Sequence, residues 1–496
     1  MTGRRRGLNA VFWDGLFAQA MDTLTTGVIL VGFALYLGAT PWVIGILGAI
    51  PFFSNLFQLL SISLVERLRD RRRIVVTASL IGRSALALAL LIPWMAPESG
   101  LVLLVCVICV RYVFGAISAG AWTSLMRDLV PQRLLGSYYA TRMRWMTIVA
   151  AILGVAGALI IDYWQRQWEE SVVWAFAGMY GLGFLASLGS LTMLLRLPEV
   201  PLPQREKKAY SQTLVLDAFI SAWNHVNFRR LMIFMASWNF AANLAAPFFA
   251  LYMLTVLNYD LTFVMLITLY SQAITAMALP RFGAYTDRFG NKPVLGFAAT
   301  LFILCLVGWS FTTLPYPHDY TTPLLVLLHT LMGIATAGIN LANNNVAFRL
   351  APRSEATSFL VANSVLSSLT AGMAPLLGGL FADYFALRQL AVEIRWLSPE
   401  GNVFLQTLNL TGWDFFFAGA AIVGLYSLHR LSLIEEGRND RRRAVARELM
   451  LDTSRMLRGI ATVAGLRDIV TTPFNIVYAM VKRTPPQRPP RRRSSQ

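Results

Sequence analysis

Long apolar runs separated by short polar or basic segments form the dominant pattern of this chain. A helix needs roughly 20 residues to cross a hydrocarbon core of about 30 Å, and twelve runs reach that length. They lie at about residues 9–37, 41–65, 74–96, 100–127, 135–162, 171–196, 229–257, 260–282, 293–313, 322–349, 355–385 and 412–433. The pattern predicts an all-α membrane protein with 12 transmembrane helices.

A polar stretch near the middle of the chain, rich in Pro and Lys, divides the twelve runs into two sets of six. We therefore predict an N-terminal six-helix bundle at residues 1–197 and a C-terminal six-helix bundle at residues 229–433. Residues 198–228 between them form a cytoplasmic linker that contains a helix. Residues 434–496 form a basic cytoplasmic tail, whose spacing of apolar and basic residues predicts an amphipathic helix on anionic lipid, or else a segment that binds a partner protein.

Composition agrees with a lipid environment, because 56% of the residues are hydrophobic, 14% are charged and the mean hydropathy is +0.55. A net charge of +17 would suggest nucleic-acid binding in a soluble protein. Here the basic residues gather in alternate loops, whereas the opposite loops hold only Arg166, Arg388 and Arg395. This asymmetry predicts that both termini are cytoplasmic and that nucleic acid is not a partner.

The residues also argue against several classes of function. The sequence contains no phosphate-binding Walker motif, no cluster of metal ligands and no defensible Ser-His-Asp arrangement. Cys106, Cys109 and Cys305 lie inside apolar runs and are interpreted as small core residues. We expect a protein that is not an enzyme and that has no cofactor or metal site.

An internal repeat relates the two halves. Several residues of the first half recur 221 positions later in the second. The recurring positions pair Glu66, Arg67, Arg71 and Asp162 with Asp287, Arg288, Lys292 and Asp383. Parallel repeats with a central loop predict two facing bundles with a polar cavity between them at the membrane midplane, which opens to each side in turn as the bundles rock.

The string GAYTDRFGNK at residues 283–292 resembles the G-x-L-a-D-R-x-G-r-K motif of the major facilitator superfamily, which follows the second span of each half. In the first copy, Glu66 replaces the motif's Asp, and Ile62 and Arg69 replace its glycines. The resemblance extends over about residues 9–433. It implies the fold of that superfamily, with N and C termini cytoplasmic.

We expect the two copies of this motif to form a cytoplasmic gate. The glycines permit a tight turn, and the charged groups can form charge-assisted bonds with neighbouring helix ends when that side is closed. The alternative is a basic anchor that only orients the chain. The gate residues are Glu66, Arg67, Arg71, Gly283, Asp287, Arg288, Gly290 and Lys292.

Ionisable residues stand inside spans of the first half, where a charge is costly unless it is paired or hydrated, and Asp14 and Arg83 are weaker functional candidates there than Arg111 and Asp22. Arg111 lies near the middle of the fourth span, and RYVFG (residues 111–115) resembles the R-x-x-x-G core of a motif found in proton-coupled exporters. Asp22 lies in the middle of the first span. We expect Asp22 and Arg111 to couple proton movement to transport; a static ion pair is the alternative.

Polar side chains at helical spacing predict the walls of the substrate cavity. In the tenth span, polar or small residues follow His329 at spacings of 4, 7, 11 and 14 residues, which places them on one face of a helix. The amides could instead hold helices together, and His329 could be a core residue. The predicted cavity residues are Gln19, Thr26, Trp122, Asn239, Asn243, His329, Thr336, Asn340 and Asn343.

These features together predict a secondary active transporter of a small organic solute that works by alternating access, with proton-coupled export favoured. The expected partners are the small-molecule substrate, protons and the lipid bilayer, and we expect a monomer in the inner membrane of a bacterial cell. One alternative is a uniporter or nutrient importer on the same fold. The other is a transporter-like sensor or an assembly scaffold that delivers pigment.

Overall fold

The computed structural model describes residues 2–131, 135–198, 212–313, 319–352, 355–398, 401–410 and 412–435 of the chain. The chain divides into two compact units, Met1–Gly437 and Arg438–Gln496. The second unit, with the amphipathic helix predicted in the tail, lies outside the described residues. All further description concerns the first unit.

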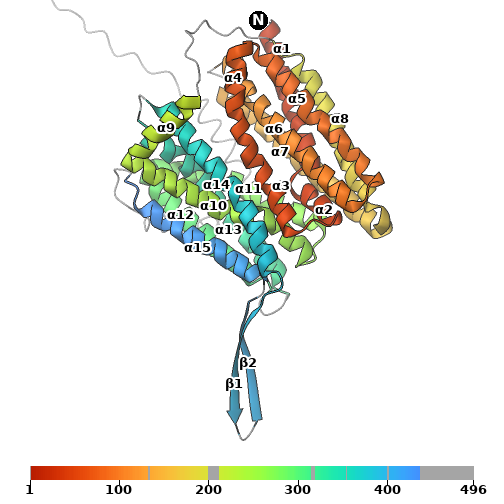
Figure 1. The fold of residues 1–496 in the computed structure, drawn as a ribbon, viewed down its shortest axis with the longest axis vertical. Coiled ribbons are helices and arrows are strands. Elements are labelled where there is room, and N and C mark those ends of the chain that lie inside the picture. Colours follow the sequence, from red (N-terminus) through yellow and green to blue (C-terminus); the bar gives the residue numbers. More distant parts are fainter. Residues whose placement is uncertain are drawn as a thin grey trace, which may run out of the picture. The chain divides into compact units, whose positions relative to one another are not determined.

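The described part of the chain contains twelve helical spans long and apolar enough to cross a membrane, which confirms the predicted number. The first six occupy the N-terminal half, hereafter the N bundle (Figure 1). Their elements are α1 (Thr2–Thr25), α2 (Gly27–Tyr36), α3 (Pro41–Ser54), η1 (Asn55–Phe57), α4 (Gln58–Leu68), α5 (Arg71–Leu88), η2 (Ala89–Trp94), α6 (Pro97–Leu129), α7 (Leu135–Gln167), η4 (Glu169–Ser171) and α8 (Val172–Leu194).

The second half, hereafter the C bundle, follows a short helix, α9 (Gln212–Asn224), which lies in the predicted linker. The spans of this half are α10 (Val226–Thr255), α11 (Leu261–Phe289), α12 (Asn291–Ser310), α13 (Thr321–Leu350), α14 (Ala356–Phe385) and α15 (Gly412–Ser432).

A two-stranded antiparallel hairpin, β1 (Leu390–Ser398) and β2 (Gly401–Leu410), connects α14 to α15. The pattern of apolar and polar residues does not predict this hairpin. It projects from the ends of these two helices, and we call this side of the helices the hairpin end (Figure 1). The other side, where the loop at Arg69 and the start of α12 lie, is the basic end.

The first span is broken between α1 and α2. Gly27 adopts φ +61°, a left-handed conformation that glycine reaches without steric cost. The break lets the two segments pack differently: α1 contacts α7 and α8 of its own bundle, whereas α2 also contacts α10 and α11 of the C bundle. A Cβ atom on Gly32 of α2 would lie 2.7 Å from Leu261 Cδ1, so α2 approaches the start of α11 closely at this residue.

The turns after the second span of each half also have left-handed residues at equivalent positions. Gly290 adopts φ +91°, and Arg69, 221 residues earlier, adopts φ +52°. The two turns are not the same, because ψ is +14° at Arg69 and +168° at Gly290. The first copy makes its turn without the glycine, at a steric cost of about 1–2 kcal/mol. Gly283 requires a correction, because it lies inside α11 rather than in the turn.

Close packing of small residues joins the bundles, because α3 packs along α14 and α7 packs along α11. A Cβ atom on Gly379 of α14 would lie 2.7 Å from the Pro41 carbonyl oxygen, and one on Gly48 of α3 would lie 2.7 Å from Pro247 Cγ. Backbones that approach so closely interact by van der Waals contact along their length, which is the main attraction available between helices in lipid.

Two carboxylates cap helices of the opposite bundle at the hairpin end. Asp162 of α7 accepts hydrogen bonds from the backbone N–H groups of Leu261 (3.1 Å) and Thr262 (2.7 Å), which begin α11. Asp383 of α14 accepts one from the N–H of Trp42 (3.1 Å), the second residue of α3. The first N–H groups of a helix have no partner inside the helix and favour an anion. The two repeated aspartates thus cap helices of opposite bundles.

This capping predicts how tightly the hairpin end is held. Asp162→Ala should widen the distance between spin labels on the two bundles at this end more than Asp383→Ala does, because it uncaps two N–H groups rather than one. Losing a cap costs about 1–2 kcal/mol. Asp260→Ala is the control: it removes an ion pair across the same interface, with Arg166 (2.5 Å), but uncaps no N–H group. Its effect should be small, because the two side chains are 57% and 68% exposed. Unchanged distances in both Asp162 and Asp383 variants would show that the caps do not hold the bundles together.

Candidate functional site

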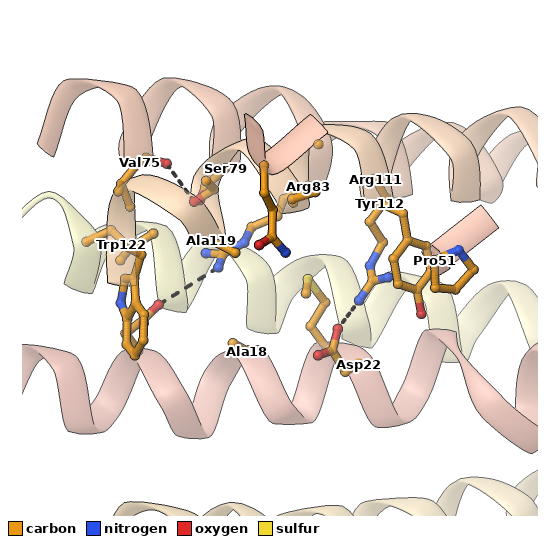
Figure 2. Close-up of a pocket in the computed structure, with 18 of the residues that line it drawn as sticks. Ala18, Asp22, Pro51, Val75, Ser79, Arg83, Arg111, Tyr112, Ala119 and Trp122 are labelled. Atoms are coloured by element: carbon orange, nitrogen blue, oxygen red, sulfur yellow. Dashed lines mark hydrogen bonds and ion pairs between the residues drawn. The ribbon is translucent and has the colours of Figure 1, made fainter. Parts of the chain in front are cut away.

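A cavity of about 400 Å³ lies inside the N bundle, among residues of α1, α3, α5, α6, α7 and α8 (Figure 2). Small polar groups and apolar side chains make up much of its wall. Five charged side chains also face it: Asp14, Asp22, Arg83, Arg111 and Arg142. A concave site that combines apolar surface with a few convergent polar groups is the usual form of a small-molecule site.

Asp22 and Arg111 form an ion pair in this cavity, and Figure 2 shows their side chains pointing toward each other from α1 and α6. Arg111 Nη2 donates to Asp22 Oδ1. The Arg111 side chain is 8% exposed and that of Asp22 is 46% exposed. The carboxylate is therefore accessible from the cavity, while the guanidinium is enclosed by protein.

A second charged group lies two helical turns earlier on α1. Asp14 accepts a hydrogen bond from the Ser190 hydroxyl, and Arg83 Nη1 donates to the same hydroxyl at 2.6 Å. Arg83 Nη2 lies 3.9 Å from Asp14 Oδ1. The hydroxyl of α8 thus bridges the two charges. The predicted site residues include neither Asp14 nor Arg83. Their position inside apolar spans was the sequence feature that could have identified them as site residues.

Arg142 of α7 is a further site residue that sequence reasoning missed. Its Nε donates to the Val11 carbonyl oxygen at 3.3 Å, and its guanidinium carbon lies 5.2 Å from the centre of the Trp122 ring. Gly15 of α1 leaves the space that the guanidinium occupies, because a Cβ atom there would lie 2.6 Å from Arg142 Cζ. No local pattern in α7 distinguishes Arg142 from its neighbour Arg144.

Of the three cavity residues predicted in the first half, Trp122 lines the cavity. Gln19 Nε2 instead donates to Thr23 Oγ1 of its own helix (3.3 Å), and Thr26 stands at the break, where its hydroxyl donates to the Asp22 carbonyl oxygen (2.6 Å).

The cavity residues predicted in the second half lie on α10 and α13, outside this cavity. Asn239 and Asn243 donate to carbonyl oxygens one turn earlier in their own helix, each at 2.8 Å. His329 is buried: its Nδ1 lies 2.9 Å from the Leu325 carbonyl oxygen and its ring packs edge-on against Trp309. Further along α13, Thr336 is half-buried, Asn340 is exposed and Asn343 Oδ1 is buried without a hydrogen-bond donor.

The predicted gate residues lie at the basic end, and two of them bind ends of other helices. Arg71 is buried, and its Nη1 contacts Asp128 Oδ2 (2.6 Å) and the Ser124 carbonyl oxygen (3.0 Å) near the end of α6. Lys292 Nζ donates to the carbonyl oxygens of Ser432 (3.0 Å) and Ile434 (2.8 Å) at the end of α15. Cations are favoured at these helix ends. The exposed members are Glu66, Arg67, Asp287 and Arg288.

The described residues contain no group of three or more His, Cys, Asp or Glu side chains that could hold a metal ion. What they do contain is two six-span bundles, repeated in sequence, with a charged cavity in one of them. This architecture defines a multi-pass membrane protein of the transporter class.

The chain belongs to the Major Facilitator Superfamily, which matches it over residues 13–315 and again over residues 231–481. Among curated proteins, none matches the sequence closely enough to count as a relative.

Solved structures of transporters have a similar fold. The nucleoside transporter NupG is 15% identical, with a TM-score of 0.60 over 88% of this chain and 100% of that one. The inward-open xylose transporter XylE from E. coli is 12% identical, with a TM-score of 0.60 over 88% and 99% of the two chains. A bacterial homologue of the human lysosomal transporter Spinster, inward-facing and occupied, is 13% identical, with a TM-score of 0.60 over 88% and 97%.

The unequal burial of Asp22 and Arg111 predicts unequal effects of removing either one. Asp22→Asn should destabilise the protein more, on the order of 2 kcal/mol, because it leaves an enclosed guanidinium without its counter-charge. Arg111→Gln should cost less, since the Asp22 carboxylate can be hydrated from the cavity. The double variant should recover most of the loss. Thermal unfolding in detergent measures all three, and equal losses in the two single variants would contradict this account.

Proposed function

We propose that this protein is a proton-coupled secondary transporter of a small organic solute, and that Asp22 and Arg111 carry the coupling. The observation that carries the proposal is their ion pair on the wall of the cavity. Ionisable side chains inside membrane spans are costly and are functional candidates by default. Membership of the superfamily supports transport as the class of function.

The coupling follows from the chemistry of the pair. A proton that reaches Asp22 through the cavity neutralises the carboxylate and leaves Arg111 without a counter-charge. An enclosed, uncompensated guanidinium is unfavourable, so the protonated state favours a rearrangement that hydrates Arg111 or gives it another acceptor. A proton can bias the equilibrium between two conformations only by as much as its affinity for the two conformations differs.

Alternating access would use the two sets of interbundle contacts. The caps at Asp162 and Asp383 are hydrogen bonds that can break and re-form, and the break at Gly27 lets α2 move relative to α1. The excess of basic residues at the basic end favours a cytoplasmic position for that end. The gate residues around Arg71 and Lys292 would then close the cytoplasmic side in the opposite state.

Export is the direction that we propose, supported by the resemblance of residues 111–115 to the motif of proton-coupled exporters. The similar structures include transporters of nucleosides and of xylose. At 12–15% identity they support the fold and give no substrate for this chain.

The coupling proposal is tested with Asp22→Asn in proteoliposomes. This variant should lose accumulation of substrate against an imposed pH gradient while counterflow remains measurable, because exchange does not require net proton movement. Both assays run in the same vesicles, so a folding defect would reduce both. If Asp22→Asn accumulates substrate as the unmodified protein does, Asp22 is not the proton carrier and the ion pair is structural.

The gate is tested separately with Asp287→Asn. Because this carboxylate lies at the exposed basic end, the substitution should leave insertion and folding largely intact, yet slow transport about tenfold if a charge-assisted bond worth about 1.4 kcal/mol closes that side. Asp70→Asn is unsuitable as a control, since Asp70 caps α5 through the Arg73 N–H (2.7 Å). Glu98→Gln, at the hairpin end of α6, removes a carboxylate of similar exposure. If the Asp287→Asn variant transports substrate at the same rate as the Glu98→Gln control, Asp287 does not close the gate.

A further inference from the structure

The charges around the cavity do not balance. Three guanidinium groups, on Arg83, Arg111 and Arg142, face two carboxylates. Arg83 lies beside Asp14, and Arg111 pairs with Asp22. Within the described part of the chain, no carboxylate lies within ion-pair distance of Arg142. Asp14 interacts electrostatically with both Arg83 and Arg142, so these two guanidinium groups share one carboxylate and the cavity wall carries an excess of one positive charge.

Arg142 is also held in place rather than free to turn toward bulk water. The Trp122 ring lies against its guanidinium, the Val11 carbonyl oxygen accepts from Nε, and Gly15 provides the space behind it. A guanidinium that stacks on an aromatic ring and lines a cavity can bind a planar or tetrahedral anion.

A second donor beside Arg142 also lacks a partner. The indole Nε1 of Trp122 is buried and has no hydrogen-bond acceptor. An indole nitrogen can only donate, and so can a guanidinium. Leaving a buried donor unsatisfied costs about 1–3 kcal/mol, so an unsatisfied indole N–H beside a guanidinium favours a ligand group that only accepts.

We propose that Arg142 and Trp122 bind the anionic group of the transported solute, a carboxylate or a phosphate. The substrate class is then a small organic anion, whose carbon body lies against apolar wall residues such as Met21, Pro51 and Leu194. Calling this ligand the transported solute rests on the proposed function; the anion site itself does not. Figure 2 places Trp122 at one end of the cavity, away from Arg111 and Asp22, so the anion and the proton occupy separate positions.

A charge-selective labelling experiment tests the site without knowledge of the substrate. Ala119 lines the cavity one turn before Trp122 (Figure 2). With Cys106, Cys109 and Cys305 replaced by Ala, Ala119→Cys should react faster with an anionic thiosulfonate reagent than with its cationic analogue. Adding Arg142→Gln should lower this rate ratio by about tenfold, because the lost charge acts on the two reagents in opposite directions.

Arg144→Gln is the matched control, because it removes the same charge from an exposed position two residues along α7. It should leave the rate ratio nearly unchanged. Gly15→Ala should shift the guanidinium without removing its charge, and should lower the ratio less than Arg142→Gln does. Equal ratios in the Arg142 and Arg144 variants, or faster reaction with the cationic reagent in the parent protein, would overturn the anion site.

A ligand screen then tests the substrate class. Thermal stabilisation is measured in nanodiscs of phosphatidylcholine alone, with inorganic phosphate and with a set of monocarboxylic acids, each beside its neutral amide. At least one acid or phosphate should stabilise the protein more than its neutral counterpart, and Arg142→Gln but not Arg144→Gln should abolish the difference. A screen in which only neutral or cationic compounds stabilise the protein, or no anion does, would overturn the proposal. Stabilisation only after adding phosphatidylglycerol would identify a lipid headgroup as the anion and exclude a solute.

The two proposals fail in different ways. Suppose that charge-selective labelling depends on Arg142 but no stabilising acid gives counterflow. This result would support the anion site and contradict transport. Counterflow that is indifferent to Arg142→Gln would keep transport and reject the anion site.

Discussion

Partnering of polar groups away from bulk water is the constraint on which this structure depends. A charge or a backbone N–H group in an apolar surrounding is costly unless another protein group satisfies it. The N bundle meets this requirement with ion pairs across helices, from Asp22 to Arg111 and from Arg71 to Asp128. At the bundle interface, Asp162 meets it by capping a helix that belongs to the other bundle. Satisfying these groups also determines which helices lie side by side.

The two repeats share the arrangement of their helices, but the side chains inside the two bundles differ. Asp162 and Asp383 perform the same task in both halves, and Arg69 and Gly290, at matching positions, both have a positive φ although their ψ angles differ. Arg111 and His329, which occupy matching positions 218 residues apart, have diverged. Arg111 faces the cavity, whereas His329 packs against Trp309, whose ring also stacks on Phe249. The charges described for the cavity therefore all belong to the N bundle.

An asymmetric interior suits a transporter whose two tasks are chemically different. A carboxylate that exchanges protons must be reachable by water, and Asp22 is half-exposed beside an enclosed Arg111. A group that binds an anion must offer hydrogen-bond donors, and the proposed anion-binding residue Arg142 lines the cavity, held there by Trp122 and Gly15. Both lie on one bundle, while the other bundle supplies an aromatic core and the surfaces of α11 and α14 against which α7 and α3 rest. Motion of one bundle against the other would change the access of water to Asp22 without dismantling either site.

Sequence by itself determined the membrane class, the twelve spans, the duplication and the family, because apolar length and repeat spacing are local properties of the chain. It also identified Asp22 and Arg111, since a charge inside an apolar run is conspicuous. Only the tertiary structure decided which charges meet. Arg142 looks like Arg144 in the sequence, and it becomes a site residue because Gly15 and Trp122 of other helices hold it. The duplication made Asp162 and Asp383 visible, but their role as caps depends on the opposite bundle, which no local pattern in either segment describes.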